Sequence, residues 1–411
     1  MHFSSRALNP LTPNDPQHKG AAVPLNRSSS FSYDTAEEVR DAFQGKADGY
    51  VYTRIGNPTV NKLEGKMAEL CGGVGAIAFA SGMAAVSTAI LSLTYAGSNV
   101  VVSSSLFVGS YSLFTKSLPK FGVDVRFFTP GEEDTIADLI DENTACVFTE
   151  VVGNPKMDFP NLAKIGEVAK EKKVPFILDA TVLAPPLLNA KKFNVALIVH
   201  STTKSISGQS RAVGGVLIDT GKFNWAKNPP KGMESYVEKY RRMAYLKCLR
   251  SQYLGDFGAC MSPDVAELTM MGLETCELRV EKQSANAMAL AKALQECEEV
   301  TAVNYIGLED NAFHEVAKAH CTSDLYGGFF AFDLGTEEKA FEFINKSKLG
   351  QIMTNLGDVR TLLIHPASTI YWMNTDEEKA EIGVTDGLVR VSVGIENTTD
   401  LVNDFINAIK G

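Results

Sequence analysis

The sequence predicts an α/β fold built on a mainly parallel, seven-stranded sheet with helices on both faces. Seven short apolar runs follow one another along the chain, and helix-like amphipathic stretches lie between many of them. Strands covered on both faces are near-continuous apolar runs, and their alternation with helices is typical of parallel sheets. The runs are Ala76–Ala80, Val100–Ser103, Val123–Phe128, Cys146–Thr149, Pro175–Leu178, Ala196–Val199 and Val213–Ile218.

Helical segments are predicted where apolar residues recur at three- or four-residue spacing. Thr59 is placed to cap a helix in which Leu63, Met67 and Leu70 share one face. Two further predicted helices lie between the apolar runs, at Met83–Leu93 and Leu162–Lys172.

Composition divides the chain into three predicted parts. Residues 1–60 are rich in Ser, Pro and Asn and lack sustained periodicity, which predicts an extended arm. Residues 61–260 hold the seven strands, and residues 261–411 form a smaller α+β domain after a long helical region. The elements predicted in this last part are a helical stretch at Asp264–Gln295, strands at Gly327–Leu334 and Leu388–Val393, and a closing helix at Thr399–Ile409.

Charge and cysteine content narrow the class of protein. The formal net charge of −10 disfavours nucleic acid and anionic membranes as partners. No apolar run reaches the roughly 18 residues of a membrane span, and residues 1–20 lack the apolar stretch of a signal peptide. Seven scattered cysteines without a Cys-x-x-Cys pair predict a reducing, cytoplasmic location and exclude a cysteine zinc site. No metal is predicted.

Polar clusters follow several of the predicted strands, at the sheet edge where ligands bind in open α/β folds. Ser81-Gly82-Met83 comes directly after the first strand and opens a helix. A helix N-terminus with a glycine can hold a phosphate on its backbone N–H groups, although a Ser-Gly pair before a helix is more often a simple cap.

An acid and a lysine follow two later strands. Asp179 could be a turn residue, or a counter-ion for a protonated ring nitrogen. Lys204 could be a solvated loop residue, or a nucleophile whose amine loses its proton on burial. Ser201 and Thr203 beside it carry hydroxyl groups that could hold a phosphate.

The arm offers one more anion-binding pair. Tyr52 and Arg54 combine a hydroxyl with a forked guanidinium donor, although most arginines are simply surface charges. A competing hypothesis is a nucleotide-binding or scaffolding α/β protein whose lysine is incidental. No Gly-x-Gly-x-x-Gly run follows the first strand, which argues against dinucleotide binding.

Taken in order, these motifs resemble the Cys/Met-metabolism group of fold-type I pyridoxal-phosphate enzymes over roughly residues 20–410. That group includes cystathionine γ-synthase, cystathionine γ-lyase, methionine γ-lyase and O-acetylhomoserine sulfhydrylase. The matching stretches are Tyr52-Thr-Arg54-Ile-Gly-Asn57-Pro58-Thr59, Phe79-Ala-Ser81-Gly82-Met83, Glu150 to Asn154-Pro155, Leu178-Asp179-Ala-Thr181, Ser201-Thr-Thr203-Lys204, Gly272-Leu273-Glu274-Thr275, His365-Pro366-Ala367-Ser368-Thr369 and Val389-Arg390-Val-Ser-Val-Gly394.

The resemblance implies a role for each motif residue. Lys204 would bind the cofactor as a Schiff base and shuttle protons, and Asp179 would pair with the pyridine nitrogen. Arg390, with Asn154 and Asn355, would bind the substrate carboxylate. The cofactor contacts implied are Ser81, Gly82, Met83, Phe107, Thr181, Ser201 and Thr203, with Tyr52 and Arg54 supplied by a neighbouring subunit. The active unit would then be at least a dimer, and in this group usually a tetramer.

Within the group, the stretches Asn355-Leu-Gly-Asp358 and Ile364-His-Pro-Ala-Ser-Thr369 favour O-acetylhomoserine sulfhydrylase. The implied reaction is γ-replacement on an O-acyl-homoserine, through a vinylglycine-type intermediate to which a thiol or another nucleophile adds. Two alternatives stay open: a γ-lyase that yields 2-oxobutanoate and ammonia, and γ-replacement with an unusual carbon or nitrogen nucleophile in a specialised pathway.

Several positions depart from the group's pattern. Phe107 stands where relatives usually have a tyrosine that stacks on the cofactor and assists proton transfer, so stacking is kept and a general acid is lost. Acetate is a good leaving group and needs little help from a general acid. The thiolate that a methionine γ-lyase releases leaves less readily, so the loss of this hydroxyl disfavours a methionine γ-lyase. The other departures are Ala180 in place of Asn, Ser205-Ile-Ser-Gly208-Gln209-Ser210 in place of Tyr-x-x-Gly-His-Gly, and Ser368-Thr369-Ile370-Tyr371 in place of Ser-Thr-Thr-His.

Overall fold

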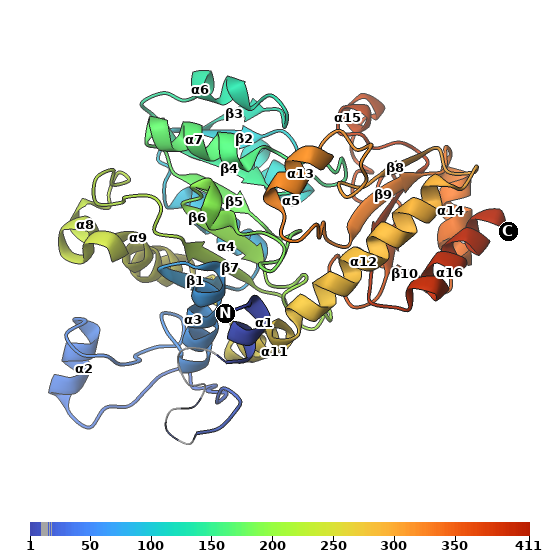
Figure 1. The fold of residues 1–411 in the computed structure, drawn as a ribbon. Helices are drawn as coiled ribbons and strands as arrows, with labels where there is room; N and C mark the ends of the chain where they lie inside the picture. Colours follow the sequence, from blue (N-terminus) through green and yellow to red (C-terminus); the bar gives the residue numbers. More distant parts are fainter. Residues whose placement is uncertain (10–14, 16, 18) are drawn as a thin grey trace.

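The computed structural model describes residues 1–9, 15, 17 and 19–411, and two β-sheets organise them (Figure 1). The larger sheet has the order β1-β7-β6-β5-β4-β2-β3 and is parallel except for β7, which runs antiparallel to both of its neighbours. All seven predicted strands are confirmed. Their bounds are β1 Gly75–Phe79, β2 Asn99–Ser103, β3 Asp124–Phe128, β4 Thr144–Glu150, β5 Phe176–Asp179, β6 Leu197–Ser201 and β7 Gly215–Asp219.

Side chains of the large sheet alternate between two hydrophobic cores because successive strand residues point to opposite faces. Ala78 belongs to one core together with α3 (Pro58–Cys71) and α7 (Leu162–Lys172). Ile77 belongs to the other core, together with α4 (Gly82–Leu91). Helices on both faces explain why the strands read as continuous apolar runs.

The cap of helix α3 lies two residues earlier than predicted. Asn57, not Thr59, is its cap: the Asn57 side chain accepts hydrogen bonds from the N–H groups of Thr59 and Val60. Pro58 then takes the first helical position, where its missing N–H is harmless. The Thr59 hydroxyl instead donates to the carbonyl of Pro24 at 2.7 Å, which holds the preceding segment against the helix.

The first sixty residues are less uniform than the predicted extended arm, of which residues 10–14, 16 and 18 lie outside the described part. Phe3–Leu8 form a helix, α1, that packs on α3 of the same chain with Phe3 and Ala7 buried. Ala36–Phe43 form α2, which buries no side chain and projects from the body of the molecule (Figure 1). The segment around α2 therefore keeps the character of an arm.

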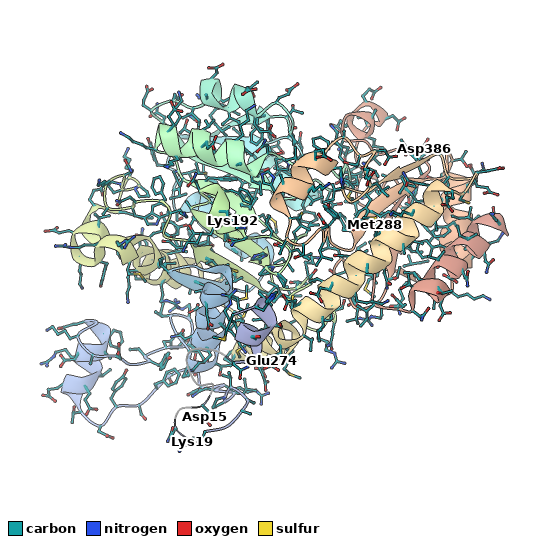
Figure 2. All side chains as sticks on the ribbon, in the orientation of Figure 1. Asp15, Lys19, Lys192, Glu274, Met288 and Asp386 are labelled. Atoms are coloured by element: carbon teal, nitrogen blue, oxygen red, sulfur yellow. The ribbon has the colours of Figure 1, made fainter. Side chains whose placement is uncertain are left out.

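Two helices link the large sheet to the second sheet. α11 (Pro263–Glu274) and α12 (Cys276–Gln295) confirm the predicted helical stretch, which is broken at Thr275. Figure 2 marks Glu274 at this break and Met288 along α12. The boundary placed between residues 260 and 261 stays a prediction.

The second sheet is mainly antiparallel and has the order β10-β11-β12-β9-β8. Its strands are β8 Ala302–Asn304, β9 Phe329–Asp333, β10 Gln351–Ile352, β11 Leu362–Ile364 and β12 Leu388–Ser392. Both predicted strands and the closing helix, α16 (Thr398–Lys410), are confirmed. The remaining helices are α5 Val108–Ser112, α6 Ile136–Leu139, α8 Glu234–Tyr240, α9 Ala244–Cys248, α10 Gly255–Phe257, α13 His314–His320, α14 Glu337–Lys346 and α15 Asp376–Glu381.

Buried polar side chains on one face of α12 bind loops of both sheets. Arg279 donates to the carbonyls of Ser205, Ile206 and Gly272, at 2.6, 3.0 and 2.6 Å. Gln283, four residues on, donates to the carbonyl of Asp358 at 2.6 Å. Asn286, three residues further along this face, has the same function.

Asn286 donates to the carbonyls of Gly394 and Glu396, at 3.0 and 2.9 Å. This face of α12 thus determines where three loops lie relative to one another. In the described part of the chain no helix is both long enough and apolar enough to cross a membrane.

Candidate functional site

One cavity of about 520 Å³ collects most of the predicted site residues. It opens at the carboxyl ends of the parallel strands, where the second sheet faces them. Twelve of the fourteen predicted residues line it: Ser81, Gly82, Met83, Phe107, Asn154, Asp179, Thr181, Ser201, Thr203, Lys204, Asn355 and Arg390.

The N-terminus of α4 forms one end of the cavity. The Ser81 side chain accepts the N–H of Ala84 and so caps the helix, which leaves the N–H groups of Gly82 and Met83 outside the helical hydrogen-bond pattern. A side chain at Gly82 would place its Cβ 2.6 Å from the Cβ of Ser201, so only glycine allows the helix to approach β6 this closely. Free N–H groups and a helix dipole make this end suitable for a phosphate.

Asp179 ends β5 inside the cavity and has no cationic partner among the described residues. Burial raises the pKa of its carboxyl group, and hydrogen bonds from the hydroxyl and the N–H of Thr181 oppose that rise. The Thr181 hydroxyl also accepts the N–H of Ser201 at 2.8 Å, which connects β5 to β6 beside the acid. A buried carboxylate held by neutral donors can bind a cation supplied by a ligand.

Glu150 lies next to Asp179 and was not predicted as a site residue. The two residues are paired across β4 and β5. Burial, followed by the negative charge of Asp179, raises the pKa of Glu150. One Glu150 oxygen accepts the N–H of Phe107 at 2.9 Å, and the other is buried without a partner. Its place at the end of an apolar run, like that of Asp179, was the signal that could have identified it.

Lys204 lies between the two sheets with its amine in the cavity. Burial, with a further contribution from the charge of Arg390, lowers the pKa of Lys204 to about 8. The Nζ atom donates to Oδ1 of Asn355 at 2.6 Å. A lysine in this state can give or take a proton near neutral pH.

Arg390 on β12 reaches the same cavity from the second sheet. It is buried, its guanidinium lies 5.5 Å from the ring of Phe329, and burial lowers its pKa to about 10. Its hydrogen bond goes to Oδ1 of Asn154 at 3.4 Å, and Asn154 is itself held by the Tyr371 hydroxyl at 2.7 Å. No carboxylate in the described chain pairs with Arg390, so the guanidinium is available to an anionic ligand.

Phe107 lies at the mouth of the cavity and is 39% exposed. Several apolar residues that were not predicted as site residues also line the cavity. They are Val108, Val182, Val213, Leu356 and Ile370. Ile370 is one of the departures from the family pattern, whereas Ala180, another departure, lines a separate cavity of about 320 Å³ with His200.

Tyr52 and Arg54 do not line the cavity of their own chain. Tyr52 is exposed, and the Arg54 guanidinium lies 5.3 Å from its ring. One Arg54 nitrogen donates to the carbonyl of Gly255 at 2.7 Å. The pair therefore sits together on a different surface, beside α10.

A buried lysine between an unpaired carboxylate and an unpaired guanidinium, with a phosphate site at a helix N-terminus, defines an α/β enzyme for an anionic cofactor and a zwitterionic substrate. In the described residues no group of three or more acidic, His or Cys side chains is placed to hold a metal ion.

Comparison with known proteins identifies the family. The chain matches the family described as "Cys/Met metabolism PLP-dependent enzyme" over residues 4–410, and it belongs to that family. It is 35% identical to the O-acetyl-L-homoserine sulfhydrylase of Leptospira meyeri, over 96% of this chain and 94% of the relative. It is also 35% identical to the homocysteine synthase of Schizosaccharomyces pombe, over 100% of this chain and 98% of the relative.

A solved structure extends the likeness to the whole fold. The putative O-acetylhomoserine (thiol)-lyase of Campylobacter jejuni, which contains N′-pyridoxyl-lysine-5′-monophosphate, superposes with a TM-score of 0.95 at 32% identity and covers all of both chains. The predicted fold type I architecture and the predicted cofactor, pyridoxal 5′-phosphate, are confirmed. The close approach of the α4 N-terminus to Ser201 at Gly82 fits the phosphate of this cofactor, and the unpaired Asp179 fits its ring nitrogen.

The lowered pKa of Lys204 predicts a pH-dependent effect on stability. The pKa of Lys204 is about 8 in the folded protein and about 10.5 in the unfolded chain, so the unfolded chain binds more protons between these two pH values. The free-energy cost of burying the Lys204 ammonium is therefore full below pH 8 and disappears as the pH rises to 10.5. We expect Lys204→Met to raise the free energy of unfolding of the cofactor-free protein by about 1–3 kcal/mol at pH 7.

Chemical denaturation between pH 7 and 10.5 measures this difference. The exposed Lys227→Met variant is the control and is expected to show no such trend. A gain in Lys204→Met that stayed constant over the whole pH range would contradict the assignment of a buried amine.

Proposed function

We propose that this protein catalyses γ-replacement on O-acetyl-L-homoserine, in which a thiol takes the place of acetate. The observation that carries the proposal is the cavity in which Lys204 lies between the unpaired Asp179 and the unpaired Arg390. In the overall reaction the γ-carbon–oxygen bond breaks, acetate leaves with the electron pair, and the thiol sulfur bonds to the γ-carbon as its proton is released. Relatives named O-acetyl-L-homoserine sulfhydrylase and homocysteine synthase support this choice of substrate.

Arg390 and Asn154 bind the substrate's α-carboxylate in this proposal. The guanidinium is buried and lacks a carboxylate partner in the described chain, so an incoming carboxylate would gain a charge-assisted hydrogen bond without breaking an ion pair. Asn154 keeps the guanidinium oriented, and Tyr371 holds Asn154. Together they place the α-carbon near Lys204.

Lys204 carries protons between substrate carbons. Its lowered pKa leaves a substantial neutral fraction near pH 8, and the hydrogen bond to Asn355 fixes the direction of the amine. Pyridoxal phosphate, when bound, supplies an electron sink for the negative charge that forms when a substrate proton is removed. Lys204 is also the residue that would attach the cofactor.

The cofactor would lie between α4 and β5. The N–H groups of Gly82 and Met83, with the hydroxyls of Ser201 and Thr203, would hold its phosphate. Asp179 would hold the protonated ring nitrogen, with Thr181 fixing the carboxylate. Ser81 supports this end indirectly as the cap of α4, and Phe107 would stack on the ring.

Tyr52 and Arg54 would complete the phosphate site of a second subunit, since both lie away from the cavity of their own chain. The active form would then be a homodimer or a tetramer built from dimers, with residues 1–60 contributing the arm. We place the enzyme in the cytoplasm, which suits seven cysteines that are all unpaired.

The test of the reaction is thiol-dependent acetate release. Purified holoenzyme with O-acetyl-L-homoserine is expected to release acetate and to form homocysteine with sulfide, or a thioether with methanethiol. Lys204→Ala is expected to abolish turnover. Acetate and amino-acid products are quantified by chromatography. Equal 2-oxobutanoate formation with and without thiol would favour the γ-lyase instead, and the absence of acetate release with every nucleophile would overturn the proposal.

Because Phe107 has no hydroxyl to protonate a leaving group, we expect the enzyme to act well only on substrates with good leaving groups. Phe107→Tyr returns a hydroxyl above the ring, where it can protonate a leaving group, and is expected to speed the release of thiolate leaving groups by about tenfold or more while acetate release changes less. Cofactor affinity should stay within about twofold of the parent, because stacking is kept. Phe121→Tyr, on an exposed ring, is the control.

The ratio of rates for cystathionine and O-acetyl-L-homoserine measures this effect. Loss of cofactor in Phe107→Tyr would show that the ring does not stack as proposed. The same ratio in both variants would show that a hydroxyl at residue 107 does not reach the leaving group.

Mixing two inactive variants tests the contribution of the arm. If Arg54 acts on the partner subunit, a dimer of Arg54→Ala and Lys204→Ala subunits contains one site with neither lesion, and the mixture should regain about a quarter of wild-type activity. Co-refolded or co-expressed variants provide the measurement. No recovery above the separate variants, in mixtures shown by mass spectrometry to contain hetero-oligomers, would place Arg54 in its own chain's site.

A further inference from the structure

Ser210 has a backbone conformation that serine seldom adopts. Its φ angle is 54°, in the left-handed region where a Cβ is crowded and glycine is favoured. It lies six residues after Lys204, close to the site but outside the group of residues that line the cavity. A residue other than glycine at such a position near an active site suggests that its side chain has a function.

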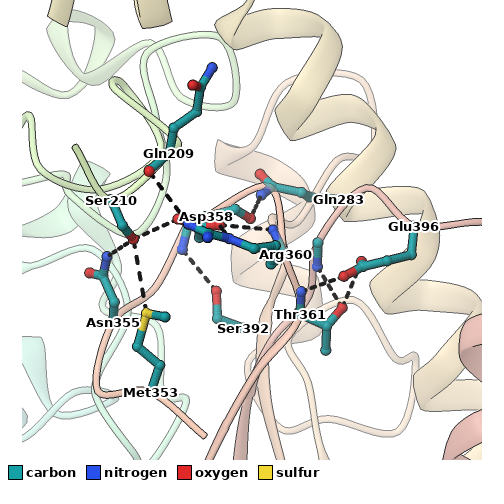
Figure 3. A network of polar contacts seen from close by, with 12 residues as sticks. Gln209, Ser210, Gln283, Met353, Asn355, Asp358, Arg360, Thr361, Ser392 and Glu396 are labelled. Atoms are coloured by element: carbon teal, nitrogen blue, oxygen red, sulfur yellow. Dashed lines mark hydrogen bonds and ion pairs between the residues drawn. The ribbon is translucent and has the colours of Figure 1, made fainter. Parts of the chain in front are cut away.

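The hydroxyl of Ser210 belongs to a chain of hydrogen bonds that ends at the amine of Lys204 (Figure 3 shows its outer part). Lys204 Nζ donates to Oδ1 of Asn355 at 2.6 Å, and Nδ2 of Asn355 donates to Oγ of Ser210 at 3.0 Å. Ser210 Oγ in turn donates to Oδ2 of Asp358 at 2.6 Å. The sulfur of Met353, at 4.0 Å, is a much weaker acceptor for the same proton.

Asp358 determines the direction of this chain. The Arg360 guanidinium donates two hydrogen bonds to the Asp358 carboxylate, at 2.7 and 2.9 Å, and the Arg360 backbone N–H donates a third at 2.9 Å. Although burial alone would raise the pKa of Asp358, the hydrogen bonds from Arg360 and Ser210 outweigh it and hold the pKa below its usual value. The carboxylate is therefore ionised and can only accept, so it takes the single proton of the Ser210 hydroxyl.

The direction of the Ser210 proton also determines the orientation of the Asn355 amide. Since the Ser210 proton is directed to Asp358, the Ser210 oxygen can only accept a hydrogen bond from its other neighbour. Asn355 must then present its NH₂ group to Ser210 and its carbonyl oxygen to Lys204. Without Ser210, only the hydrogen bond to Lys204 would distinguish the two ends of the Asn355 amide.

We infer that Ser210 is a positioning residue whose hydroxyl fixes the orientation of the Asn355 amide, so that a carbonyl oxygen and not an NH₂ group faces the amine of Lys204. The inference rests on the proposed role of Lys204 as proton carrier. With the carbonyl facing it, the neutral amine directs one N–H to Asn355 and keeps its lone pair free for a substrate proton. With the amide reversed, the NH₂ group of Asn355 would face the amine, which could avoid a clash of two donors only by accepting through its lone pair, so the lone pair would be engaged.

The test uses glycine, which suits the backbone conformation of Ser210 and removes its hydroxymethyl side chain. Ser210→Gly is expected to lower kcat about tenfold, equivalent to one hydrogen bond, with little change in KM for the amino acid. Lys173→Gly is the control, because exposed Lys173 has a similar φ of 59° at the end of α7, far from the cavity. Both variants should be as thermally stable as the parent or more so.

Double substitution tests whether Ser210 acts through Asn355. If it does, Ser210→Gly should cause no further loss of kcat in an Asn355→Ala background. Fully additive losses, or a Ser210→Gly variant with parental kcat, would overturn the inference.

A second readout does not depend on the reaction. Trace labelling of amines across a pH series, followed by mass spectrometry of the cofactor-free protein, gives the pH at which Lys204 is half labelled. Loss of the carbonyl partner disfavours the ammonium form, so this pH should fall in Ser210→Gly and stay unchanged in Lys173→Gly. An unchanged value in Ser210→Gly would overturn the inference even if the substrate were not O-acetyl-L-homoserine.

Discussion

The site depends on one buried helix face. Arg279, Gln283 and Asn286 of α12 donate hydrogen bonds to carbonyls of three loops. Each unsatisfied carbonyl would cost about 1–3 kcal/mol, so these bonds restrict the loops strongly. One of the loops follows Lys204 and another contains Asp358. The distance between the lysine and its second-sheet neighbours is therefore determined by α12, which holds the loops but does not line the cavity.

Close packing around Arg279 extends this constraint to the lysine itself. Gly208 has a φ of 70°, and a side chain there would overlap the Arg279 guanidinium. The N–H of Gly208 donates to the carbonyl of Lys204 at 2.8 Å, and its own carbonyl accepts the N–H of Val359. The loop after Lys204 is thus held against both the helix and the second sheet. This rigidity is what allows a single hydroxyl, that of Ser210, to matter to the direction of an amine.

Charge separation gives the cavity its chemistry. Asp179 and Arg390 come from different sheets, and each lacks an oppositely charged partner in the described part of the chain. Buried charges of this kind are unfavourable in the empty protein and favourable once a ligand supplies the partner. Lys204 lies between them with a lowered pKa, because burial and Arg390 both disfavour its ammonium form. A zwitterionic amino acid and a cofactor with a cationic ring would satisfy both charges at once.

Sequence alone determined the elements whose cause is local or periodic. The seven strands were predictable because burial on both faces requires continuous apolar runs. Of the twelve predicted residues that line the cavity, seven were predictable from their place after those strands: Ser81, Gly82, Met83, Asp179, Ser201, Thr203 and Lys204. The other five, Phe107, Asn154, Thr181, Asn355 and Arg390, were predicted from the family resemblance. The cap of α3 and the helix α1 were missed, since a Pro58 at the first helical position and a docking surface on α3 decide them. Only the tertiary structure showed that Glu150 adjoins Asp179, that Tyr52 and Arg54 lie outside their own cavity, and that Ser210 is hydrogen-bonded to Asn355. These relations join residues distant in the chain, and their geometry arises only when the two sheets and α12 pack together.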